Sequence, residues 1–189
     1  MNKKRNVTFI GLGTMGYHMA GHLANSGLAN VKVYNRTSEK AEKWLVDFEG
    51  EMATTLKEAV SDADVIITCA GRDEDMMEIV FSENGLQPHL KEGAIFVDHT
   101  TTSFKLAKHL SETLKEKNIC FIDAPVSGGE AGAVNGVLRV MAGGDKGALE
   151  CATTLIESYS KKISYMGESG YGQLDKMVNQ ICIAGLLQG

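Results

Sequence analysis

Short apolar runs recur along the chain and alternate with stretches in which apolar residues have helical spacing. The runs cover residues 7–10, 31–34, 65–68, 94–97, 119–122 and 137–141. This alternation is typical of βαβ units, which build a parallel sheet. The runs are apolar on both faces, as expected of strands that helices cover on both sides. We therefore predict an α/β fold with a mostly parallel sheet and helices on both faces.

The last segment of the chain has a different pattern. Residues 171–188 carry no strand signal and are predicted to form one long helix, which is almost wholly apolar over residues 181–187. A helix that is apolar on all sides requires burial. We therefore divide the chain into a domain of residues 1–168 and the start of an interdomain helix, residues 169–189. We expect the helix to pack against the remainder of a longer chain or against another subunit.

Composition narrows the class of protein. The chain has 189 residues, of which 43% are hydrophobic and 23% charged, values typical of one globular domain. A net charge of −5 argues against a nucleic-acid partner, because that affinity depends on basic surface. No apolar run approaches the roughly 20 residues that span a bilayer, so we expect no membrane association.

Cysteine and histidine spacing does not indicate a metal site. The four cysteines are far apart in sequence and form no CxxC pair, so we expect reduced thiols in a cytoplasmic protein. His18 and His22 are four residues apart on a predicted helix, but no carboxylate or cysteine completes a ligand set. We predict that the chain binds no metal.

A glycine-rich turn follows the first predicted strand and opens the first predicted helix. In this context Gly-x-Gly-x-x-Gly is the fingerprint of a doubly wound Rossmann domain. The first glycine allows a tight turn, the second lets the backbone approach a pyrophosphate, and the third lets helix and strand pack closely. The helix N-terminus supplies free N–H groups for the phosphates. We predict that the cofactor-binding residues here are Gly11, Leu12, Gly13, Thr14, Met15 and Gly16.

Cofactor selectivity is expected at the end of the second predicted strand. NAD-binding domains usually place an acidic residue there for the ribose 2′-hydroxyl, but this chain has Asn35, followed by Arg36 and Thr37. A guanidinium can bind a 2′-phosphate through charge-assisted hydrogen bonds. We therefore predict that these three residues favour NADP(H) over NAD(H). Alternatively, Arg36 is a solvated turn residue and Ser38 an N-cap.

Three blocks of sequence together resemble the β-hydroxyacid dehydrogenase family, which includes 3-hydroxyisobutyrate dehydrogenase, tartronate semialdehyde reductase and 6-phosphogluconate dehydrogenase. The blocks are the glycine-rich turn continued by Met19, Ala20 and Leu23, the segment Asp-Ala-Pro-Val-Ser-Gly-Gly at residues 123–129, and Gly-x-Gly-x-x-x-Lys-x-x-Asn at residues 170–179. Members of the family normally continue into an all-helical C-terminal domain. The resemblance implies that this chain lacks that domain and that the full protein is a homo-oligomer through it.

The resemblance also implies roles for site residues. Lys176 would be the catalytic proton-transfer group, and Thr101 would lie against the nicotinamide. A small carboxylate-bearing substrate would be bound by Ser127, Gly128, Gly129, Asn179 and Gln180. From the residues alone, Ser-Gly-Gly is equally a flexible turn. The threonines at 100–102 are equally a cap for a helix that begins near residue 103.

These features together predict an NADP-dependent 3-hydroxyacid dehydrogenase or semialdehyde reductase. Gln180 stands where 3-hydroxyisobutyrate dehydrogenases typically have a second asparagine, which is more similar to the tartronate semialdehyde reductase branch. One alternative is a 6-phosphogluconate dehydrogenase-like enzyme, although no extra basic cluster for a sugar phosphate is present. Another is a non-catalytic NADP-binding module, which would have no need for the lysine. Imine reductases share the fold but generally lack lysine at this position.

Overall fold

Every predicted apolar run forms a strand of one sheet in the computed structural model, which describes residues 4–188. Within that range the side chains of residues 183 and 185–188 are not described, so the predicted burial of segment 181–187 falls mostly on side chains outside the described ones. The strands that match the predicted runs are β1 (Arg5–Ile10), β2 (Ala29–Tyr34), β4 (Val65–Thr68), β5 (Ile95–Asp98), β6 (Cys120–Asp123) and β8 (Leu138–Gly144).

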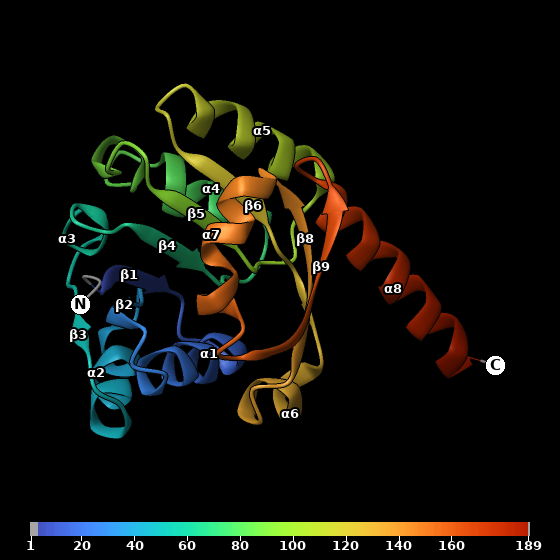
Figure 1. The fold of residues 1–189 in the computed structure, drawn as a ribbon, viewed down its shortest axis with the longest axis horizontal. Helices are drawn as coiled ribbons and strands as arrows, with labels where there is room; N and C mark the ends of the chain where they lie inside the picture. The colour runs from blue at the N-terminus through green and yellow to red at the C-terminus, as the bar shows by residue number, and fades with distance from the viewer. Residues whose placement is uncertain (1–3, 189) are drawn as a thin grey trace.

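The strand order determines where the winding of the sheet reverses. The first part runs β3-β2-β1-β4-β5-β6, all parallel, where β3 is the two-residue strand Glu51–Met52. This is the 3-2-1-4-5-6 order of a Rossmann sheet, whose direction of winding reverses between β1 and β4. Ligands bind outside the carboxyl ends of the strands at such a reversal point. Figure 1 shows these strands side by side in one twisted sheet.

Three strands, the two-residue β3 among them, and one strand direction were not predicted. β7 (Val126–Ser127) follows β6 after Pro125, and the chain then turns back through α6 (Gly129–Val134), so that β8 runs antiparallel to β6 and β7. Gly128 and Gly129 have positive φ values of 137° and 61°, which permit this reversal. β9 (Ser160–Gly167) pairs with β8 and has many polar and exposed residues, which explains why it gave no apolar signal.

Helices cover both faces of the sheet, as predicted. One face carries α1 (Thr14–Asn25), α2 (Ser38–Asp47) and α7 (Lys146–Ile156); the other carries α3 (Leu56–Val60), α4 (Asp73–Phe81) and α5 (Phe104–Lys115). Neighbouring residues of one strand enter opposite cores: Ile67 packs with the first group and Ile66 with the second. The short 3₁₀ helix Gln87–His89 lies between α4 and β5.

The predicted terminal helix is present as α8 (Tyr171–Gln188). Its first turns contact β8 and β9, and the rest projects from the body of the molecule (Figure 1). The exposed fraction rises along it to 70% at Ile181. The proposed division at residue 168 falls between β9 and α8. Among the described residues, no helix has both the length and the apolar character that crossing a bilayer requires.

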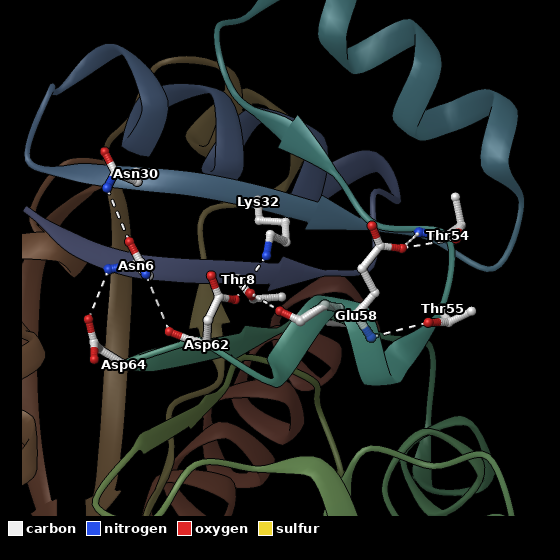
Figure 2. A network of polar contacts seen from close by, with 10 residues as sticks. Asn6, Thr8, Asn30, Lys32, Thr54, Thr55, Glu58, Asp62 and Asp64 are labelled. Atoms are coloured by element: carbon white, nitrogen blue, oxygen red, sulfur yellow. Dashed lines mark hydrogen bonds and ion pairs between the residues drawn. The ribbon is translucent and has the colours of Figure 1, made fainter.

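A polar network attaches α3 to the first two strands (Figure 2). Asn6 receives a hydrogen bond from Asn30 and donates its amide nitrogens to the loop before β4, while Lys32 pairs with Asp62 at 2.9 Å. The Thr8 hydroxyl donates to the Ala59 carbonyl inside α3. These contacts fix α3, which carries one wall of the cavity described below.

A second, fully buried network joins β5 to the loop after β6. His99 Nδ1 lies 2.6 Å from the Ala124 carbonyl oxygen and Nε2 lies 2.9 Å from the Tyr159 hydroxyl. A carbonyl only accepts, so Nδ1 carries the proton and Nε2 accepts from Tyr159. Burial lowers the pKa of His99 to about 4, so the ring is neutral at neutral pH.

We predict that replacing His99 changes how stability depends on pH. The unfolded chain takes up a proton at about pH 6.5, so stability from neutral His99 is complete above that pH and is lost as pH falls toward 4. The advantage of the wild type over His99→Gln in urea unfolding should therefore shrink by about 2–3 kcal/mol between pH 7.5 and 4. Burial raises the pKa values of Asp98 and Asp123 to about 6, so these two carboxyl groups favour the folded state as the pH falls. This contribution is the same in the wild type and in His99→Gln and does not affect their difference. Parallel pH profiles for the two proteins would contradict the prediction.

Candidate functional site

A cavity of about 980 Å³ lies over the carboxyl ends of β1, β2 and β4, at the reversal point of the sheet. The glycine-rich turn forms its floor, and the segment after β2, α3 and α4 form its walls. Its lining includes Gly13, Arg36, Leu56, Ala70 and Ile79. The cavity is open to solvent and large enough for much of a dinucleotide.

The glycines of the turn have the three roles that the fingerprint implies. Gly11 has a φ of 98°, and a Cβ there would overlap the Cys69 carbonyl oxygen. A Cβ on Gly16 would overlap the Gly11 carbonyl oxygen, so this glycine allows α1 to pack against the turn. A Cβ on Gly13 would meet no atom within 4 Å. The N-terminus of α1 has no side-chain cap, which leaves its N–H groups available to an anion. These features fit a pyrophosphate.

Asn35 supports the turn from the end of β2. Its Oδ1 accepts a hydrogen bond from the Leu12 amide at 2.8 Å, and its Nδ2 donates to the Thr37 carbonyl at 2.9 Å. Leu12 is itself buried and belongs to the core. The Asn35 side chain and the Leu12 amide thus stabilise the glycine-rich turn through polar groups that already have hydrogen-bond partners. Thr14 and Met15 begin α1 at the floor of the cavity.

Arg36 lies on the rim of the cavity with Thr37 beside it. The side chain of Arg36 is 75% exposed, and its Nη1 lies 3.3 Å from Glu78 Oε2. Arg36 is therefore solvated, as in the alternative interpretation, and also paired with α4. The N-cap position of α2 is occupied by Thr37, not Ser38, and no side-chain capping hydrogen bond forms there.

Lys176 is buried on α8, with only 8% of its surface exposed. Its Nζ donates a hydrogen bond of 2.9 Å to the Val126 carbonyl oxygen, immediately before Ser127. Burial lowers the pKa of Lys176 below the usual value for lysine. The structure therefore brings the predicted proton-transfer group to the predicted substrate loop, in which Gly128 and Gly129 are exposed.

The loop that carries Thr101 is attached to the same helix. Gln173, one turn before Lys176, donates to the Thr100 carbonyl at 2.7 Å and accepts from the Thr102 amide at 3.0 Å. Thr101 between them is exposed. The Thr100 hydroxyl accepts from the Ala70 amide at 2.9 Å, and Ala70 lines the cavity, so this loop is linked to it. A helix, α5, begins next to residue 103 as predicted, but its N-cap is the Ser103 hydroxyl and not one of the threonines at 100–102.

Asp123 fixes the start of α8. Its two carboxylate oxygens accept hydrogen bonds from the amides of Gly170, at 2.7 Å, and Gln173, at 3.0 Å. A Cβ on Gly172 would overlap the Asp123 and Met141 carbonyl oxygens, so the helix begins in direct contact with the sheet. Burial raises the pKa of Asp123 to about 6, while the amide hydrogen bonds act in the opposite direction.

The remaining predicted residues lie farther along α8 or are engaged elsewhere. The Oδ1 atom of Asn179 is buried and has no hydrogen-bond partner, whereas Gln180 is exposed. His22 Nε2 lies 3.0 Å from the carbonyl oxygens of Ala133 and Val134, so it joins α1 to α6. Within the described part of the chain, no group of three histidine, cysteine or acidic side chains is arranged to hold a metal ion.

Sequence reasoning assigned no role to the residues that position the site. Asp98 and Asp123 are register partners at the ends of β5 and β6, and each is a carboxylate that closes an apolar run. That signal was visible in the sequence. Gln173 gave no signal, because polar residues are common on helices. The carboxylates of Asp75 and Glu78 line the cavity only because the fold brings α4 close to Arg36, in the segment after β2.

Comparison with known proteins agrees with this geometry. Residues 6–167 match the family model described as the NAD binding domain of 6-phosphogluconate dehydrogenase. A relative from Shewanella frigidimarina, described as an uncharacterized oxidoreductase, is 48% identical over 97% of this chain and 62% of its own length. An NAD-dependent L-serine dehydrogenase from Pseudomonas aeruginosa is 33% identical over 98% of this chain and 61% of its own length.

A solved structure shows the same fold. The 3-hydroxyisobutyrate dehydrogenase of Mycobacterium tuberculosis, determined with L-serine, superposes with a TM-score of 0.90 at 28% identity, covering 96% of this chain and 61% of that protein. The chain thus spans about three fifths of the length of these relatives. It belongs to the family of the 6-phosphogluconate dehydrogenase NAD binding domain, and the predicted resemblance to the β-hydroxyacid dehydrogenases is confirmed.

Proposed function

We propose that this chain is the dinucleotide-binding part of an NADP(H)-dependent dehydrogenase or reductase of small β-hydroxyacids and the corresponding semialdehydes. The observation that carries the proposal is Lys176, buried with its ammonium on the carbonyl that precedes the Ser127 loop. A binding module has no need for a desolvated lysine at that place. When bound, the nicotinamide supplies or accepts the hydride.

The residues of this chain would position substrate and move one proton. Ser127 would donate its hydroxyl, and the glycine pair its exposed amides, to the substrate carboxylate. Lys176 would protonate the oxygen that gains charge during carbonyl reduction and would remove that proton in the reverse direction. Its lowered pKa supports the second role, because a base must lose its own proton first.

Two similar proteins support the substrate class. L-serine, named for the Pseudomonas relative and present in the Mycobacterium structure, is a small carboxylate with a β-hydroxyl group. The decisive experiment assays the full-length protein with a panel of short 3-hydroxycarboxylates and both oxidised cofactors. Oxidation of at least one of them supports the proposal; binding of cofactor with no turnover of any would favour a non-catalytic module.

We propose, too, that the exposed apolar side of α8 packs against the remainder of a longer chain or another subunit. Met177, Val178 and Ile181 are 49%, 59% and 70% exposed, and contiguous apolar surface usually marks an interface.

We predict that replacing Gly16 affects stability, whereas replacing Gly13 affects binding of the dinucleotide. Gly16→Ala should lower the free energy of unfolding by about 1–3 kcal/mol, because its Cβ overlaps backbone. Gly13→Ala should leave stability within about 0.5 kcal/mol but weaken NADPH binding roughly tenfold, because its Cβ enters the space for phosphate. Urea unfolding and fluorescence titration measure the two effects. Equal behaviour of the two variants would contradict the assignment of the cradle.

NADPH should bind at least about tenfold more tightly than NADH, and Arg36→Ala should remove most of the difference by losing about 1.5–3 kcal/mol of charge-assisted bonding. Arg72→Ala is the matched control, because Arg72 is similarly exposed, pairs with Glu74 and is not among the residues that line the cavity. Titration of both nucleotides measures the ratio. Equal dissociation constants in the wild type would refute the preference.

Lys176→Ala should lower kcat at least about a hundredfold while the dissociation constant of NADPH changes little, as expected of a proton-transfer group. In the oxidative direction the wild-type kcat/KM should rise with pH as Lys176 loses its proton, and this rise should disappear in the variant. Lys161→Ala, an exposed lysine on β9, controls for loss of charge. Near-normal turnover of Lys176→Ala would exclude this residue from the mechanism.

A further inference from the structure

Two carboxylates on α4 face the arginine to which the 2′-phosphate is assigned. Arg36 Nη1 lies 3.3 Å from Glu78 Oε2 and 3.8 Å from Asp75 Oδ1. All three residues line the same cavity as Gly13. The guanidinium is therefore already paired at the place where a phosphate would have to bind.

The charges around this cavity do not give it an excess of positive charge. Its cationic side chains are Arg36, Lys40 and Lys57, and its carboxylates are Asp75, Glu78 and Glu83, with His89 also on the lining. A phosphate monoester carries about −1.5 to −2 charges at neutral pH. A 2′-phosphate would thus meet equal numbers of cationic and anionic side chains, and two of the three carboxylates already lie within ion-pair distance of Arg36.

The ion pair between Arg36 and the carboxylates of α4 is weak enough for a ligand to displace it. The side chains of Arg36 and Glu78 are 75% and 63% exposed, and exposed ion pairs contribute little because water screens them and the side chains lose freedom. Binding a 2′-phosphate can therefore release Arg36, but the carboxylates stay well within a Debye length of about 8–10 Å. Both effects, loss of the pair and repulsion, oppose the phosphate and leave a 2′-hydroxyl unaffected.

Asp75 and Glu78 differ in how freely they can withdraw. Asp75 is in the first turn of α4, where the helix dipole favours a carboxylate, and its side chain is 30% exposed. Glu78 is one turn further on, is closer to Arg36 and is more exposed. Glu78 therefore has the larger influence on the arginine, and Asp75 adds a fixed negative charge behind it.

We propose that Asp75 and Glu78 are specificity-determining residues that hold Arg36 and limit the affinity for the 2′-phosphate of an adenosine dinucleotide. This inference rests on the dinucleotide-binding function proposed above. Two elements thus set the ratio of NADPH to NADH affinity: the segment after β2 raises it through Arg36, and the exposed face of α4 lowers it through its carboxylates. A purely structural ion pair would instead change stability and the binding of both cofactors alike.

The test is equilibrium titration of the full-length protein with NADPH, NADH, adenosine 2′,5′-bisphosphate and adenosine 5′-monophosphate. Glu78→Gln should tighten binding of the two 2′-phosphorylated ligands about three- to tenfold, and Asp75→Asn about two- to fivefold, with NADH and the monophosphate changed less than about twofold. The gain should shrink at high salt. Glu74→Gln is the matched control, because Glu74 is on the same helix, pairs with Arg72 and is not among the lining residues.

A double variant tests whether Glu78 acts through the arginine. In the Arg36→Ala background, Glu78→Gln should improve binding of the bisphosphate clearly less than it does in the wild type, because only the repulsion between carboxylate and phosphate is then relieved. The inference is overturned if Glu78→Gln shifts NADPH and NADH equally, if it shifts neither, or if its full gain persists without Arg36.

The wild-type titration separates this inference from the proposed NADP(H) preference. If the wild type does not favour NADPH but Glu78→Gln raises the ratio, the preference fails and the inference stands. If the wild type favours NADPH and Glu78→Gln leaves the ratio unchanged, the preference stands and the inference fails. If neither cofactor binds the wild type, both fail.

Discussion

The candidate site depends on one buried carboxylate, Asp123, which receives the first amides of α8. Its hydrogen bonds to Gly170 and Gln173 join the helix to the end of β6, and the absence of a side chain at Gly172 lets them approach. The rest of the arrangement follows from this contact. Gln173 then reaches the 100–102 loop, and Lys176, one turn on, reaches the Val126 carbonyl. A helix displaced from Asp123 would lose all three.

Burial of this contact has an electrostatic consequence. Asp98 and Asp123 are register partners at the ends of neighbouring strands, and burial raises the pKa of each to about 6. Amide and hydroxyl donors offset part of that cost, as expected for buried carboxylates. The neutral His99 lies between the same strands and Tyr159. The sheet edge thus concentrates polar groups that are costly to bury, which is where a reaction site is expected in this class of fold.

The two halves of the site differ in how they handle charge. Around Lys176 the chain buries a cation and lowers its pKa, which favours proton transfer. Around Arg36 the charges are exposed and balanced by carboxylates from α4, which favours reversible exchange of partners over tight binding. The Thr100 hydroxyl, bonded to the Ala70 amide, connects the two regions. In the proposed function, cofactor selectivity and proton transfer would therefore rest on different physical effects.

The sequence alone determined six of the strands and their alternation with helices, the glycine turn, the long α8 and the residue types at the site. These features were predictable because periodicity, turn chemistry and helix spacing are local properties of a chain. The sequence did not reveal the two-residue strands β3 and β7, or β9, whose residues are largely polar or partly exposed, or the return of β8 against β6. Only the tertiary structure decided the partners of the functional side chains, since these are distant in sequence: Lys176 and Val126 are 50 residues apart, Gln173 and Thr102 are 71 apart, and Arg36 and Glu78 are 42 apart. Such pairs are fixed by how the sheet and helices pack, and no local pattern records which side chains that packing brings together.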